Sequence, residues 1–170
     1  MGPRKPAGWM AVLLVALACA RTPVAAAPEG SAPESLGRNE VVMLYRSPCV
    51  AACPVYSVRM TPEGRIIYDG RERVARLGSA TAQITQPRLD ALLHELEAAG
   101  YFLFADRYRP SEPVCGRYVP DAPTVITSVR LRDRVKRIEH DQGCGNAPQA
   151  LTVLERRIDE VLGTRRWTHR

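Results

Sequence analysis

The chain has 170 residues, a formal net charge of +6, 45% hydrophobic residues and 25% charged residues. This length and composition fit one globular domain with an ordinary hydrophobic core, and they exclude a chain that is disordered throughout. Beyond the N-terminal run, no segment is apolar enough over a sufficient length to cross a bilayer.

The first residues have the features of an export signal. Arg4 and Lys5 give a positively charged start, and residues 10–18 form a wholly apolar run. A membrane-spanning helix needs about 20 such residues, so this run is too short for a lasting anchor. We therefore expect the chain to leave the cytoplasm.

Two processing sites compete at the end of this run. Residues 16–19, Ala-Leu-Ala-Cys, resemble the lipobox of bacterial lipoproteins, in which the cysteine becomes the lipidated first residue. The run Ala-Ala-Ala at 25–27 resembles an ordinary signal-peptidase site. We favour the lipobox because the cysteine directly follows the apolar run. Residues 1–19 are thus predicted to be a lipoprotein-type signal peptide, with Cys19 as the lipidation site.

Residues 20–40 are rich in Ala, Pro, Ser, Gly and Glu and show no apolar period. They are predicted to be a disordered linker, which as a flexible coil would span about 25 Å. Ala20 follows the predicted lipidated cysteine, and by resemblance to other lipoproteins this favours the outer membrane in a cell with two membranes. If the other processing site is used, the protein is periplasmic or secreted.

The body begins with strands. Residues 41–46, VVMLYR, are a short apolar run, and residues 55–61 alternate between apolar and polar side chains. Pro, Glu and Gly at 62–64 form a turn, and residues 65–69 return as the partner strand. Weaker strand candidates follow at 71–77 and 82–85.

A helix is predicted to open at residues 85–87, Thr-Gln-Pro, and to end at Gly100. Its apolar stripe has helical spacing and consists of Leu89, Leu92, Leu93 and Leu96. The proline-rich segment 105–123 is predicted to be a long loop.

The second half repeats this order. Residues 124–131 alternate strongly and predict a strand, and residues 135–140 return after a turn at 132–133. A second helix closes at Gly163, and its apolar stripe is Leu151, Leu154, Ile158, Val161 and Leu162. The neighbouring acids Glu155, Asp159 and Glu160 are spaced as on the exposed face of a helix, so they are predicted to be solvated.

The order strands, helix, strands, helix predicts an α+β fold. Hairpins pair antiparallel, and two one-sided helices need one sheet face to cover, so we expect an antiparallel sheet of about five or six strands covered on one face by two helices. The single domain is predicted to span residues 41–163, followed by a basic tail at 164–170.

Several runs together resemble a known family. They are CPVYSVRMTPEGRIIYDGRERV, AAGYFLFADRY and PTVITSVRL, followed by a glycine-rich stretch ahead of the last helix. This combination resembles a bacterial domain-of-unknown-function family, number 6438, over about residues 40–162. The resemblance implies a small exported α+β domain and implies no activity, substrate or catalytic residue.

The exported domain keeps four cysteines, Cys49, Cys53, Cys115 and Cys144. An even number in an oxidising compartment predicts disulfide bonds. We favour pairing Cys49 with Cys53 and Cys115 with Cys144; the second bond would close a loop of about 30 residues and contribute about 3 to 4 kcal/mol. The two crossed pairings stay open.

Metal binding and catalysis by the cysteines have weaker support. Cys49 and Cys53 have acceptable spacing for zinc, with Cys115 and either Cys144 or His140 completing a tetrahedron, but thiols outside the cytoplasm tend to be oxidised. Thiol redox catalysis favours Cys-x-x-Cys at a helix start, and this spacing is one residue longer. A catalytic pair of Cys144 with His140 can be imagined. We expect no catalytic residue, metal or cofactor.

A basic hairpin is the remaining surface feature, and a second basic strand carries Arg71, Arg73 and Arg76. If the two meet, they form a positive patch for envelope anions such as lipid headgroups or acidic glycans, rather than for nucleic acid. An ordinary solvated hairpin that guards a sheet edge is the alternative. The predicted anion-binding residues are Arg130, Arg132, Arg134, Lys136 and Arg137.

These features predict an exported cell-envelope module, held to a membrane by its N-terminal lipid, that acts by binding or as a structural accessory and not by catalysis. The expected partners are the membrane, an anionic envelope surface or another envelope protein. The alternative is a Cys/His metal-binding protein or thiol-dependent enzyme.

Overall fold

The structure is a computed structural model, and it describes residues 1–2 and 35–169. Cys19, the predicted signal peptide and most of the predicted linker lie outside the described residues. Within the described ranges, no helix has the length and apolar character needed to cross a membrane.

The first four strands form an antiparallel meander, and the predicted hairpin at 55–69 is confirmed. Its turn uses Gly64 with φ of 78°, and a Cβ there would lie 2.6 Å from the carbonyl oxygen of Ile84. The strands are β1 (Val42–Arg46), β2 (Val55–Met60), β3 (Arg65–Glu72) and β4 (Gly78–Gln83).

The boundaries around residues 71–85 differ from those predicted. β3 continues to Glu72, the chain bends over residues 73–77, and β4 begins at Gly78. Arg73 has φ of 52°, which breaks the extended backbone, and Val74 turns inward to 3% exposure. The predicted strand at 71–77 therefore becomes a bend between two strands.

The two main helices begin and end close to the predicted residues. α1 (Gln86–Ala98) follows Thr85 and ends before Gly100, and α2 (Gln149–Leu162) ends at Gly163. Both glycines are left-handed, with φ of 76° and 66°, which is why each helix stops there.

The predicted loop 105–123 contains short regular elements. β5 (Arg107–Tyr108) pairs parallel with β7 (Arg134–Asp141), which in turn pairs antiparallel with β6 (Thr124–Leu131). Two single-turn 3₁₀ helices, η1 (Tyr101–Leu103) and η2 (Pro113–Cys115), lie on either side of β5.

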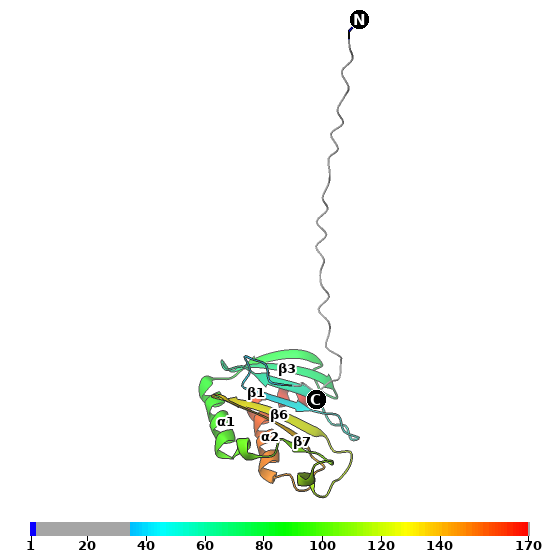
Figure 1. Cartoon of the computed structure of the whole chain (residues 1–170), viewed down its shortest axis with the longest axis vertical. Helices are drawn as coiled ribbons and strands as arrows, with labels where there is room; N and C mark the ends of the chain where they lie inside the picture. The colour runs from blue at the N-terminus through cyan, green and yellow to red at the C-terminus, as the bar shows by residue number, and fades with distance from the viewer. Residues whose placement is uncertain (3–34, 170) are drawn as a thin grey trace.

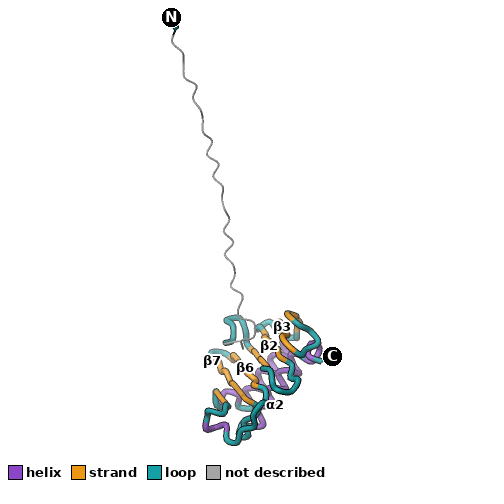
Figure 2. Tube along the Cα trace, turned by 90° about the vertical axis from the view of Figure 1, so that its right-hand side faces the viewer, coloured by secondary structure: helices purple, strands orange, loops and turns teal. Residues whose placement is uncertain are grey.

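The sheet has seven strands in the order β4-β3-β2-β1-β6-β7-β5. The α+β class is confirmed, but the expected count of about five or six strands is too low because β5 adds a short parallel edge. α1 and α2 lie on the same side of the sheet (Figure 1), and the helical segments stay grouped against the strands in the view turned by 90° (Figure 2).

A third helix, α3 (Arg165–Thr168), occupies the region expected to be a basic tail. Its Trp167 stacks on Tyr68 with ring centroids 4.7 Å apart, and the Trp167 carbonyl accepts a hydrogen bond of 2.9 Å from the Arg76 amide. The fold therefore continues past Gly163, and α3 closes the end of the core.

The other face of the sheet carries a smaller apolar cluster. Met43, Tyr45, Val55 and Ile126 are buried there, and Leu36 packs against them. The residues just before β1 therefore lie back over this face; the Glu40 carbonyl, for example, accepts a hydrogen bond from Arg130 Nε at 3.2 Å.

Replacing Trp167 with Ala should lower the free energy of unfolding by about 3 kcal/mol, because it removes a large buried side chain stacked on Tyr68. Chemical denaturation followed by circular dichroism measures this. Arg165→Ala on the same helix is exposed and should change it by less than about 0.5 kcal/mol. Equal effects of the two substitutions would mean that α3 is not part of the core.

Candidate functional site

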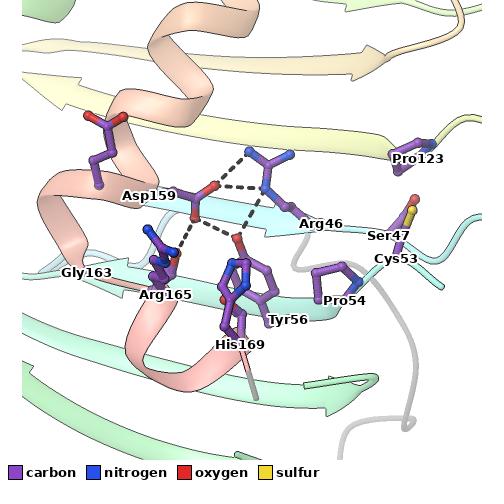
Figure 3. Close-up of a pocket in the computed structure, with 13 residues that line it drawn as sticks. Arg46, Ser47, Cys53, Pro54, Tyr56, Pro123, Asp159, Gly163, Arg165 and His169 are labelled. Atoms are coloured by element: carbon purple, nitrogen blue, oxygen red, sulfur yellow. Dashed lines mark hydrogen bonds and ion pairs between the residues drawn. The ribbon is translucent and has the colours of Figure 1, made fainter. Parts of the chain in front are cut away.

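A cavity of about 510 Å³ opens where the ends of β1 and β2 meet the C-terminal end of α2 and the short helix α3. Figure 3 shows the side chains that line it, which come from segments far apart in the sequence. The lining residues include Arg46, Cys53, Tyr56, Asp159, Thr164 and Arg165.

Asp159 is the centre of the polar floor of this cavity. Its Oδ2 accepts hydrogen bonds from Arg46 Nε at 2.9 Å and Arg46 Nη2 at 2.7 Å. Its Oδ1 accepts from Tyr56 OH at 2.6 Å and from Thr164 Oγ1 at 2.8 Å. Both carboxylate oxygens are therefore used, and the four donors hold the group in one orientation (Figure 3).

The strand pattern explains why these side chains converge. In β1, Val42 and Leu44 point into the core, and Arg46 is the next residue on that face, at the strand end. In β2, Tyr56 points to the same face and pairs directly with Arg46 across the strands. The last turns of α2 pass over this end of the sheet, so Asp159 meets both.

Burial and neighbouring charges keep Tyr56 protonated and Arg46 charged. Burial raises the pKa of Tyr56 well above its ordinary value, and the neighbouring Asp159 charge raises it further. Burial lowers the pKa of Arg46, but the charge and hydrogen bonds of Asp159, together with the nearby Tyr56 and Glu155, outweigh this and the net shift is upward. At neutral pH Tyr56 is thus a fixed donor and Arg46 a fixed cation, which suits binding better than proton transfer.

Sequence reasoning did not find this cluster, and its expectation for two acids was wrong. Asp159 was expected to be a solvated helix acid, and its side chain is 17% exposed and bound to Arg46. Glu155, one turn earlier, was also expected to be solvated and is 1% exposed. Their spacing of four residues places both on the inward side of α2, but their partners lie on strands that only the fold brings close.

Glu155 belongs to a second buried pair. His140 Nδ1 lies 2.7 Å from Glu155 Oε1, and Gln142 Nε2 donates to Glu155 Oε2 at 3.2 Å. His140 is 3% exposed, so the pair is closed off from solvent. The imagined catalytic pair with Cys144 is not formed, because Cys144 is in a disulfide and His140 bonds to Glu155.

All four cysteines of the domain are in disulfides, as the sequence predicted. Cys49 joins Cys53 with their Cα atoms 5.6 Å apart, and Cys115 joins Cys144 with theirs 4.6 Å apart. In residues 1–2 and 35–169, no group of three or more His, Cys, Asp or Glu side chains is placed to hold a metal ion.

The five predicted anion-binding residues all have partners within the chain. Arg132 and Arg134 both contact Glu97, and Arg134 also lies over the Phe102 ring at 4.3 Å. The remaining contacts are Arg130 with the Gly37 and Glu40 carbonyls, Lys136 with Asp106, and Arg137 with Glu139.

The two basic strands also do not meet. The sheet order places β2, β1 and β6 between β3 and β7. A single positive patch built from both strands is therefore not formed, and anion binding by the β6–β7 hairpin stays a prediction.

Asp159→Asn should lower the free energy of unfolding by about 2 kcal/mol, because it leaves the partly buried Arg46 without its counter-charge. Thermal or denaturant unfolding at neutral pH measures the change. The matched control is Glu160→Gln, the next residue on α2, whose side chain is 66% exposed and which should change stability by less than about 0.5 kcal/mol. Similar losses for both would show that the Asp159 cluster does not hold α2 to the sheet.

Comparison with known proteins identifies the family of this chain. No curated protein matches the chain. Residues 40–162 match a family described as Domain of unknown function (DUF6438). The match runs from Glu40, two residues before β1, to the end of α2, so it covers most of the chain and includes the cavity floor apart from Thr164. The resemblance seen in the sequence is confirmed, and the chain belongs to the DUF6438 family.

Proposed function

We propose that this protein is a non-catalytic binding module of the bacterial cell envelope, tethered to a membrane by a lipid on Cys19. The observation that carries the binding function is the cavity of about 510 Å³ with its fixed polar floor. Cavities of this size are within the range that takes small ligands or an anchoring side chain of a partner.

The floor supports recognition because it is already organised. Asp159 orients Arg46 through two of the guanidinium nitrogens, and no contact among the described residues uses the third, Nη1. A rigid charged donor at the base of a mostly apolar cavity can bind a polar group without first losing conformational freedom. Each member of the floor has a partner, since Arg46, Tyr56 and Thr164 all donate to the Asp159 carboxylate.

The two disulfides support a location outside the cytoplasm, since such bonds persist in oxidising compartments. The apolar run and the Ala-Leu-Ala-Cys sequence at 16–19 support export and lipidation. Ala20, directly after the predicted lipidated cysteine, supports a location at the outer membrane in a cell that has two membranes.

The alternative, a Cys/His metal protein or thiol-dependent enzyme, has less support. Its cysteines are oxidised, and His140 is buried against Glu155. We therefore give the binding module precedence.

The anchor can be tested by replacing Cys19 with Ala. The unaltered protein should be found in the membrane fraction and should incorporate a labelled fatty acid. The Cys19→Ala protein should lose the label and leave that fraction, because the lipid that holds it to the membrane is no longer attached. Fatty-acid labelling that persists in the Cys19→Ala protein would contradict the lipid anchor. An unaltered protein found in the soluble fraction would also contradict it.

The binding site can be tested by photo-cross-linking in cells. A p-benzoyl-phenylalanine residue replaces Arg165 at the cavity, and a control replaces Arg65, which is exposed on β3 and does not line the cavity. We expect a discrete adduct from position 165 that is absent from position 65. The same adducts from both positions, or none from position 165, would count against the cavity as the binding site.

A further inference from the structure

The two disulfides lie in opposite environments. Cys115 and Cys144 are 1% and 5% exposed and belong to the main hydrophobic core. Cys49 and Cys53 are only half-buried, and the three residues between them are exposed, with Val50 at 78%. A thiol in solution can therefore approach the first bond far more easily than the second.

The fold also depends on the two bonds to different degrees. Cys115 and Cys144 are 29 residues apart and tie η2 to the loop before α2. Cys49 and Cys53 are four residues apart and close only a small loop between β1 and β2. Those strands stay joined by their own backbone ladder, so opening the small loop leaves the sheet intact.

The cavity distinguishes the two sulfurs of the exposed bond. Cys53 lines the cavity, and Figure 3 shows it beside Ser47 and Pro54 at one end. Two cations, Arg46 and Arg165, line the same space. The acids there are Asp159, which is bound by Arg46, and Glu160, whose carboxylate contacts Arg157 at 3.4 Å. Figure 3 shows Arg165 beside Asp159, at the other end of the cavity from Cys53. Cys49 Sγ lies 2.9 Å from the Ala51 carbonyl oxygen, whose partial negative charge disfavours a thiolate at Cys49, so Cys53 is the better leaving group.

We propose that the Cys49–Cys53 disulfide is a site of covalent modification by low-molecular-weight thiols. The thiolate attacks Cys49 Sγ, a new sulfur–sulfur bond forms there, and the Sγ–Sγ bond breaks. Cys53 leaves with the electron pair as a thiolate, because the better-stabilised thiolate is the better leaving group. A second thiolate that attacks the incoming thiol's sulfur releases Cys49 and forms the oxidised thiol dimer, so two thiols supply the two electrons.

This goes beyond the binding function, because it places a reactive bond on the wall of the cavity. Modification of Cys49 frees Cys53 and opens the loop of residues 47–54 that forms one end of the cavity. The Cys115–Cys144 bond stays closed throughout.

The test incubates the purified oxidised protein with increasing reduced glutathione, quenches with acid, alkylates free thiols and maps each cysteine by peptide mass spectrometry. Cys49 and Cys53 should react at roughly tenfold lower glutathione than Cys115 and Cys144. The glutathione adduct should be on Cys49, with Cys53 alkylated, while the circular dichroism spectrum stays native. Simultaneous reduction of all four cysteines, an adduct on Cys53, or no reaction before unfolding would each overturn the proposal.

Discussion

The carboxylate of Asp159 holds together the end of this domain where the cavity opens. Its four hydrogen bonds connect α2 to the ends of β1 and β2 and to the residue that begins the final turn of the chain. Four donors on one carboxylate compensate for its partial burial, and they fix the positions of Arg46, Tyr56 and Thr164 at once. The cavity opens at this polar junction, whereas most of the remaining interface between helices and sheet is closed by apolar side chains.

A second buried polar contact reinforces the same helix. Glu155 is one turn before Asp159 and binds His140 on β7, so α2 is tied to both halves of the sheet through two carboxylates. The Cys115–Cys144 bond adds a covalent link ahead of that helix. These constraints surround α2, and the small loop closed by Cys49 and Cys53 lies outside them.

Local patterns in the sequence were sufficient for most of the fold. Alternation over residues 124–131 and the turn at 62–64 predicted β6 and the first hairpin, and the glycines at 100 and 163 predicted both helix ends. β5 has two residues and pairs with a strand far along the chain, so no local period marks it. The cavity floor was missed for a related reason: Arg46, Tyr56 and Asp159 are each unremarkable on their own element, and only the packing of α2 across two strands brings them together.

The chain enters β1 across the sheet face that lies opposite the helices. Leu36 packs against the sheet face that α1 and α2 leave open, and Arg130 on that face binds the Gly37 carbonyl. Arg46 and Tyr56 point to the other, helix-covered side, where the cavity opens. The residues that lead into β1 and any occupant of the cavity therefore lie on opposite faces of the sheet. Filling the cavity would leave the contacts of Leu36 and Gly37 with the sheet undisturbed.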